Sequence, residues 1–149
     1  MHSWTDVEFL HDPHWARPEI VRCCGNNGAI CIGLVNLPAF RGALAQVKRQ
    51  IEDGMRVHDF GAGPYIHWFR CKRGRHRSVG MANLVGFALQ ECERIDCDIQ
   101  HLDMNENSPR PPCGCPDACR YIANMDLVVE FAQQLLEACN EAARAWRSL

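Results

Sequence analysis

The stretch CKRGRHRS at residues 71–78 decides the fold of this chain, because it separates two segments with different periodicities. The apolar run at 65–69 before it is typical of a strand, and residues 79–89 after it carry apolar side chains at helical spacing. We therefore predict a tight turn that leads from a strand into a helix. The first turn of a helix has unpaired N–H groups and the positive end of the helix dipole, so this turn should attract an anion.

The side chains of this turn match that prediction, because five cationic residues fall between positions 70 and 77. Arg77 can bind two phosphate oxygens at once. Gly74 permits a backbone conformation that turns amides inward. The predicted anion-binding residues of the turn are Lys72, Arg73, Gly74, Arg75, His76, Arg77 and Ser78.

Composition limits the class of protein. The 149 residues are 47% hydrophobic and 23% charged, which indicates one globular domain. A net charge of −2 excludes a general polycation, so nucleic-acid binding would need a local patch. No apolar stretch approaches the ~18 residues of a membrane span, and the N-terminus lacks a signal-peptide pattern. We expect a cytoplasmic protein with no membrane contact, whose ten cysteines are reduced thiols or metal ligands.

Periodicity predicts alternating strands and helices. We expect strands at 7–10, 65–70 and 95–102, a loop at 16–29, and helices at 38–55, 77–93 and 121–146. This order predicts an α/β fold with a small, mainly parallel sheet sandwiched by helices. The prolines after Asn105 exclude regular structure. We therefore expect a domain at 1–104, a Pro/Cys-rich loop at 105–120, and a C-terminal helix at 121–149 packed on the same domain.

The turn also matches the phosphate loop of cysteine-dependent phosphatases, which has the pattern Cys-x5-Arg-Ser. In that alternative, Cys71 is the nucleophile and the basic turn lowers the pKa of its thiol. The candidate general acids are Asp12, Asp59 and Asp103. Arg70 stands where these enzymes usually have histidine. The opposing interpretation is that Cys71 is a small buried residue at the end of a strand.

A second cysteine cluster has the spacing of a metal site. Cys113, Cys115 and Cys119 lie within seven residues, and the last two have a Cys-x-x-x-Cys spacing that suits structural zinc. The sequence offers a fourth ligand in Cys92, Cys97 or His101. Free thiols or a local disulfide remain the alternative.

Two separated segments resemble a known family. They are Asp6–Trp15 and Cys71–Val79, and Ile99–Asp103 resembles the closing strand of the same family. In this order they resemble the C-terminal domain family of RapZ, the bacterial RNase adapter protein. The resemblance covers about residues 4 to 104.

The resemblance implies a compact α/β domain that binds a phosphorylated sugar or another anion and, in the bacterial protein, contacts small RNA. It implies that His14 faces the turn, and that Gly74, His76, Arg77 and Ser78 line the anion pocket. The sequence departs from the family pattern at four positions, which are Glu8, Asp12, Lys72 and Arg73. No phosphate-binding loop of the Gly-x-x-x-x-Gly-Lys-Ser/Thr type occurs, so we expect no ATP or GTP binding.

Sequence alone therefore predicts a binding domain with no certain cofactor. The expected partner is a phosphorylated small molecule or an RNA phosphate backbone, and the oligomeric state stays open. The alternative is the cysteine-dependent phosphatase.

Overall fold

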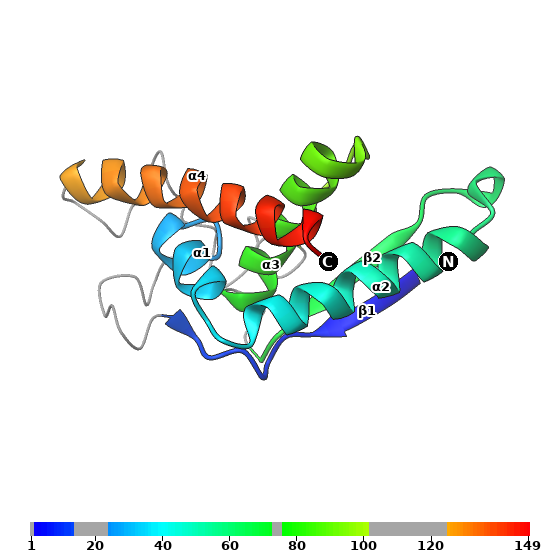
Figure 1. Ribbon diagram of the computed structural model, residues 1–149, viewed down its shortest axis with the longest axis horizontal. Coiled ribbons are helices and arrows are strands. Elements are labelled where there is room, and N and C mark those ends of the chain that lie inside the picture. The colour runs from blue at the N-terminus through cyan, green and yellow to red at the C-terminus, as the bar shows by residue number, and fades with distance from the viewer. Residues whose placement is uncertain (1, 14–23, 73–75, 102–124) are drawn as a thin grey trace.

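A computed structural model of the chain describes residues 2–13, 24–72, 76–101 and 125–149. It has an α/β fold, as the sequence predicted, in which a two-stranded parallel sheet is packed against four α-helices (Figure 1). A 3₁₀ turn and a π-helical turn complete the described elements. In chain order they are β1 (His2–Asp6), α1 (Gly28–Val35), α2 (Phe40–Val57), η3 (Phe60–Ala62), β2 (Ile66–Arg70), α3 (Arg77–Ala88), η4 (Leu89–Glu93) and α4 (Met125–Arg147).

The sheet is formed by segments that are far apart in the sequence. β1 and β2 pair in parallel, with His2 opposite Ile66 and Asp6 opposite Arg70. The amphipathic helix α2 lies along the sheet and contacts β1 (Figure 1). Because the strands are parallel, both of their carboxyl ends lie at one edge, which we call the carboxyl edge.

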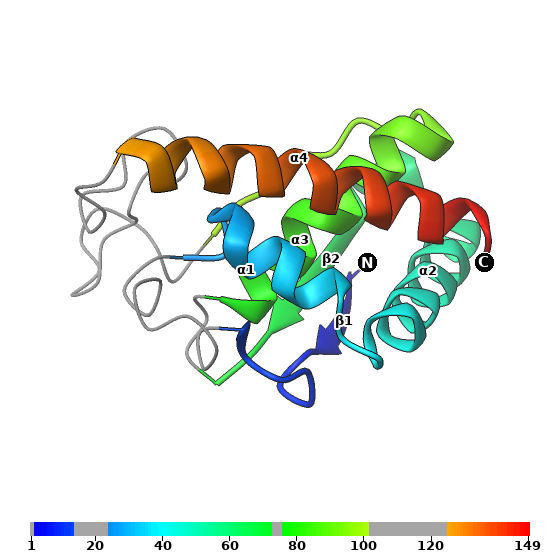
Figure 2. The same cartoon turned by 60° about the vertical axis from the view of Figure 1, so that its left-hand side comes forward.

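The core lies between α1, α3 and α4, and Figure 2 shows α4 lying across the other two. Gly28 allows the start of α1 to approach α4, since a Cβ at this position would lie 1.6 Å from the carbonyl oxygen of Phe131. At the other end of α4, Trp146 is buried and its indole N–H donates to Glu93 at 3.0 Å. These contacts connect α4 to the start of α1 and to the end of η4.

Several elements follow the sequence prediction closely. The strand expected at 65–70 is β2, and the helix expected at 38–55 is α2. The helix expected at 77–93 is divided into α3 and η4, and Arg94 ends it with a left-handed φ of 58°. Most of the predicted C-terminal helix is α4.

The predicted first strand is wrong, because residues 7–10 form a turn and the strand lies at 2–6. Val7 and Leu10 are buried, whereas Phe9 is 58% exposed. The apolar residues at 7–10 therefore belong to a turn whose first and last residues are buried in the core. The backbone N–H of Leu10 donates to the carbonyl of Val7 and closes this turn at 3.2 Å.

The predicted third strand and the predicted loop at 16–29 also need correction. Residues 95–101 form no strand, since Ile99 packs against α3 at Gly86, and position 102 lies outside the described residues. The end of the predicted loop is already helical, because α1 begins at Gly28. Asn27 caps this helix by accepting from the backbone N–H of Ala29 at 2.8 Å.

Among the described helices, none by itself has the length and apolar composition needed to cross a membrane. Only α1 and α2 taken together pass that test, and they are bent by 93° relative to each other.

Candidate functional site

Two turns meet at the carboxyl edge of the sheet. One follows β1 at residues 7–13, and the other follows β2 and leads into α3. The backbone N–H of Val7 donates to the carbonyl of Arg70 at 2.8 Å, which joins the turns at their base. Ligands of α/β folds commonly bind beyond the carboxyl ends of strands, and the turn singled out in the sequence lies at this edge.

Arg77, the first residue of α3, ties the two turns together. Its Nη1 donates to the carbonyl oxygen of Leu10 at 2.9 Å and also to that of Glu8. Its Nε lies 3.8 Å from a carboxylate oxygen of Asp12. The guanidinium group therefore serves the folded structure as well as carrying a positive charge at the start of the helix.

His76 and Asp12 form the second contact between the turns. Nδ1 of His76 lies 3.1 and 3.2 Å from the two carboxylate oxygens of Asp12. The histidine is 7% exposed, so this contact is shielded from water. The carboxylate of Asp12 thus supplies a negative charge at a helix N-terminus, where an anion is favoured.

Cys71 and Ser78 lie side by side at the end of β2 and the start of α3. The thiol sulfur is 3.2 Å from the serine hydroxyl oxygen, and both residues are buried. Cys71 follows the end of a strand and Ser78 lies at the start of a helix, which is the local order that the sequence predicted. Lys72, the next residue along the turn, is exposed.

A close approach of the chain at Gly25 supports this turn, and sequence reasoning missed it. A Cβ on Gly25 would lie 2.2 Å from the backbone nitrogen of Gly80 and 2.4 Å from the carbonyl oxygen of His76. Only glycine allows the turn at 24–27 to pack against the first turn of α3. The sequence predicted a loop at 16–29 but did not indicate what Gly25 packs against.

The structure brings together part of the predicted anion site. His76, Arg77 and Ser78 share the start of α3, with Lys72 on the preceding turn. The other predicted residues, which are His14, Arg73, Gly74 and Arg75, lie outside the described residues.

The candidate general acids do not share one place. Asp12 contacts the turn. Asp59 instead caps η3, where its carboxylate accepts from the backbone N–H of Gly61 at 2.9 Å. Since η3 lies between the end of α2 and the start of β2, Asp59 is at the opposite end of the sheet. Asp103 lies outside the described residues.

The predicted zinc ligands Cys113, Cys115 and Cys119 also lie outside the described residues. Within the ranges that the structure describes, no group of three or more His, Cys, Asp or Glu side chains could hold a metal ion. That statement includes Cys92, Cys97 and His101, the residues considered as a fourth ligand.

A second polar cluster, which the sequence did not predict, lies between the sheet and α2. Nδ1 of His67 is 2.6 Å from the hydroxyl oxygen of Ser3, and Nε2 is 3.0 Å from that of Thr5. Thr5 in turn donates to the side chain of Gln50 on α2 at 2.5 Å, and Tyr65 donates to the Gln50 carbonyl. Burial lowers the pKa of His67 from 6.5 to about 4, because no contacting charge offsets the loss of water.

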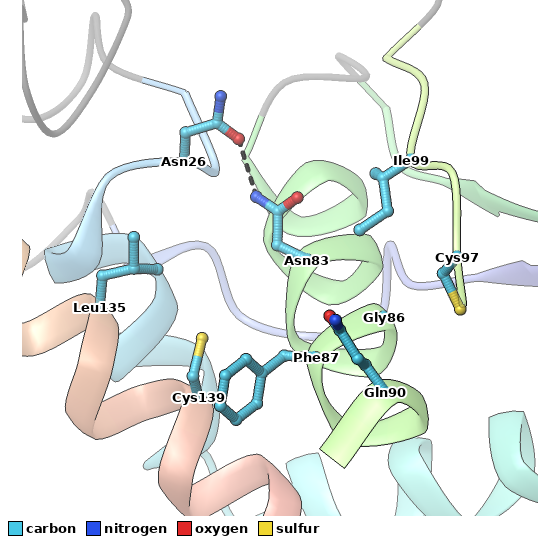
Figure 3. Close-up of a pocket in the computed structure, with 9 residues that line it drawn as sticks. All are labelled: Asn26, Asn83, Gly86, Phe87, Gln90, Cys97, Ile99, Leu135 and Cys139. Atoms are coloured by element: carbon cyan, nitrogen blue, oxygen red, sulfur yellow. Dashed lines mark hydrogen bonds between the residues drawn. The ribbon is translucent and has the colours of Figure 1, made fainter. Parts of the chain in front are cut away.

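A cavity of about 340 Å³ lies elsewhere, between α3, α4 and the segment after η4 (Figure 3). Asn83 donates to the side-chain oxygen of Asn26 at one end of it, at 2.7 Å. No charged side chain lines the cavity among the described residues. Burial raises the pKa of the lining thiols Cys97 and Cys139, so both are neutral at pH 7. This cavity therefore lacks the charge that a phosphate site needs.

Comparison with known proteins identifies the family of this chain. The model of the family described as RapZ C-terminal domain matches residues 1–105, which include both turns of the carboxyl edge. No curated protein and no solved structure matches the chain. The family match covers more than half of the 149 residues and agrees with the α/β fold and with the sequence resemblance. The chain therefore belongs to the RapZ C-terminal domain family.

Proposed function

We propose that this chain binds a phosphorylated small molecule, of the sugar-phosphate type, at the carboxyl edge of its sheet. The observation that carries this proposal is the position of Arg77. Its Nε–H is buried and has no acceptor within hydrogen-bond distance among the residues that the structure describes. It lies at the N-terminus of the 12-residue helix α3, whose first turn contains no acidic residue. A phosphate oxygen would satisfy this donor and the positive end of the helix dipole together.

The surrounding groups suit an oxyanion. The hydroxyl of Ser78 is a second donor at the start of α3, and the exposed ammonium group of Lys72 adds positive charge on the preceding turn. The carboxylate of Asp12 partly neutralises this charge, so we expect moderate rather than tight phosphate binding. Membership of the RapZ C-terminal domain family supports a phosphorylated sugar as the ligand class.

The test is isothermal titration calorimetry with inorganic phosphate, sulfate and glucose 6-phosphate, supported by thermal melts. A ligand that binds only the folded state raises the melting temperature by mass action. We expect phosphate and the sugar phosphate to bind, and the sugar phosphate to bind more tightly. If none of these anions gives binding heat or stabilisation, the proposal is wrong.

Lys72→Glu is the first variant to examine, because Lys72 is exposed and its replacement leaves the hydrogen bonds of Arg77 to the turn after β1 in place. We expect about tenfold weaker phosphate binding, which corresponds to about 1.4 kcal/mol. Arg56→Glu is the matched control. Arg56 is exposed at the end of α2, where Gly54 approaches Tyr65 at the start of β2, far from the carboxyl edge. Equal losses in both variants would indicate general attraction rather than a site.

An RNA backbone is the other phosphate source that the sequence predicts. A short single-stranded RNA in the same titration separates the two, since backbone binding weakens steeply as salt rises. We expect the affinity for glucose 6-phosphate to change little between low and moderate salt. RNA binding that disappears in the Lys72→Glu variant, with no sugar-phosphate binding, would assign the site to RNA.

One contact favours the phosphatase as a second candidate function. A hydroxyl 3.2 Å from the sulfur of Cys71 can donate a hydrogen bond to a thiolate nucleophile at this position. In such a reaction the thiolate attacks phosphorus, the ester oxygen leaves with a proton from Asp12, and water then hydrolyses the phosphocysteine. Cys71→Ser decides between the functions, because binding should survive while any turnover of a phosphate-ester panel should disappear. Absence of wild-type turnover removes the enzyme.

A further inference from the structure

The inner face of the sheet is unusually polar for a covered face, although Phe69 of β2 also packs there against the core. On the inner face, which α2 covers, β1 presents Ser3 and Thr5, and His67 extends from β2 into their hydrogen-bonded cluster. The outer face carries the tryptophans Trp4 and Trp68 instead. A sheet with one face in water normally buries its apolar residues and exposes its polar ones.

The apolar residues of the outer face are open to solvent. Trp4 is 58% exposed, and Trp68 and Ile66 are each 41% exposed. Trp4 and Trp68 stand directly opposite each other in the register of the two strands. A contiguous exposed apolar face of this kind marks an interaction surface.

Charged residues flank this surface in a pattern that is complementary to itself. Asp6 and Arg70 face each other at the carboxyl end of the pairing. Neither has an ion-pair partner among the described residues. A two-fold axis parallel to the strands and midway between them would place β1 of one copy over β2 of the other. Asp6 would then lie over the partner's Arg70, and Trp4 over the partner's Trp68.

We propose that the outer face of the sheet is the contact surface between two copies of this chain, packed face to face about that axis. The arrangement belongs to the aligned class of sheet packing, in which strands of the two sheets run in similar directions. It covers four tryptophans in the pair and forms two symmetric Asp–Arg ion pairs. A two-fold axis perpendicular to the strands would place Arg70 over Ile66 and form no such pairs.

The size of the surface sets the strength of the association. Two strands of five residues each give a small patch, below the area of a standard stable interface. The dimer should therefore dissociate on dilution, and its formation should depend on protein concentration. This inference does not rest on the proposed phosphate site, because Trp4 and Trp68 carry it and the charged pair Asp6 and Arg70 only adjoins the carboxyl edge.

The first experiment is sedimentation velocity of the full chain, 16.9 kDa as a monomer, from about 1 µM to about 1 mM. We expect the mass to double as concentration rises. Replacing both Trp4 and Trp68 with serine should weaken association at least tenfold. Leu136→Ser is the matched control, because Leu136 is 62% exposed on α4 and its loss should leave association unchanged. A chain that stays monomeric throughout would overturn the proposal.

The second experiment tests the axis with two charge reversals. Arg70→Glu alone and Asp6→Lys alone should each weaken self-association, because like charges then face each other. A mixture of the two variants should form a heterodimer, in which both ion pairs are restored. A dimer that the tryptophan changes weaken but that the mixture does not restore would contradict this arrangement of the copies.

The carboxylate of Asp6 also accepts from the backbone N–H of Glu8 at 2.8 Å, so each variant is first checked by circular dichroism. If Asp6→Lys does not fold, the double tryptophan variant and Arg70→Glu still decide the result. A wild-type dimer that neither of them weakens uses another surface, and the proposal is then wrong.

Discussion

The polar cluster at the carboxyl edge and the polar cluster between the sheet and α2 each contain a histidine, but the surroundings of the two histidines differ. His76 at the carboxyl edge contacts the carboxylate of Asp12 and lies next to the guanidinium group of Arg77. Among the described residues, His67 on the inner face of the sheet hydrogen-bonds with the neutral hydroxyls of Ser3 and Thr5. The first cluster holds opposite charges that a ligand can rearrange. The second holds a neutral network whose partners are all supplied by the protein.

The difference teaches where a charge is tolerated in this fold. At the carboxyl edge, a positive group and a negative group lie within 3.8 Å, so each offsets the cost of removing the other from water. The described residues of the inner face form no such pair, and burial is the cause of the lowered pKa of His67. We therefore propose the first cluster, and not the second, as the place where an anion binds.

Removal of the positive charge at the carboxyl edge should give the largest effect. Arg77→Met removes the guanidinium group beside the largely buried carboxylate of Asp12 and frees two carbonyl oxygens of the turn after β1. We expect the free energy of unfolding to fall by about 3–5 kcal/mol. Urea denaturation followed by circular dichroism measures this loss. Arg77→Lys keeps the charge and should lose less stability. A change below about 1 kcal/mol in the Met variant would contradict a stabilising role for the contacts of Arg77 with the turn after β1.

The second-largest effect should be a loss of stability in acid, when His67 in the neutral cluster becomes protonated. The pKa of His67 is about 4 in the folded protein and 6.5 in the unfolded chain. Between these values the unfolded chain binds more protons than the folded protein. The contribution of the neutral His67 to the free energy of unfolding is therefore fully present above pH 6.5 and is lost as the pH falls toward 4. One pKa unit corresponds to about 1.4 kcal/mol, and solvent reaches part of the ring, so we expect a loss of about 2 kcal/mol.

Urea denaturation between pH 7 and pH 4.5 measures this contribution. His67→Gln keeps a neutral polar side chain and should give a flatter pH dependence than the wild type. His11→Gln, at an exposed histidine, should leave the wild-type slope unchanged. Equal slopes for the wild type and His67→Gln would show that other groups control the acid response.

The smallest effect should come from Asp12→Asn, which sharpens the comparison by making the carboxyl edge more positive. The amide can still accept from His76, but it no longer opposes an incoming anion. We expect phosphate affinity to rise about tenfold, or about 1.4 kcal/mol. Calorimetry with inorganic phosphate measures it, and Asp12→Glu is the charge-retaining control. Weaker binding in Asp12→Asn would mean that the carboxylate holds the site in shape.

Sequence reasoning located the carboxyl edge because its signals are local. The run at 65–69, the basic turn and the helical repeat that follows are contiguous, so strand, turn and helix could be predicted in order. It could not predict that Arg77 binds the carbonyls of Glu8 and Leu10, since these residues are more than 60 positions away.

The first strand was misplaced for a different physical reason. β1 places Trp4 on its exposed face and Thr5 on its buried face, so its hydrophobic alternation is opposite to that of an ordinary strand. Residues 7–10 have the ordinary alternation but form the turn. The helix α1 was missed because residues 16–29 were predicted as a loop, and the helix begins at Gly28, before that predicted loop ends.

The pairing of β1 with β2 has a consequence for the speed of folding. His2 meets Ile66, so the chain must close a loop of about sixty residues before the first strand hydrogen bond forms. Closing such a loop costs about 3–4 kcal/mol of chain entropy by the logarithmic rule. The helices can form from local contacts before that closure. The sheet is therefore a late event, and the carboxyl edge, which needs both strands, is assembled last.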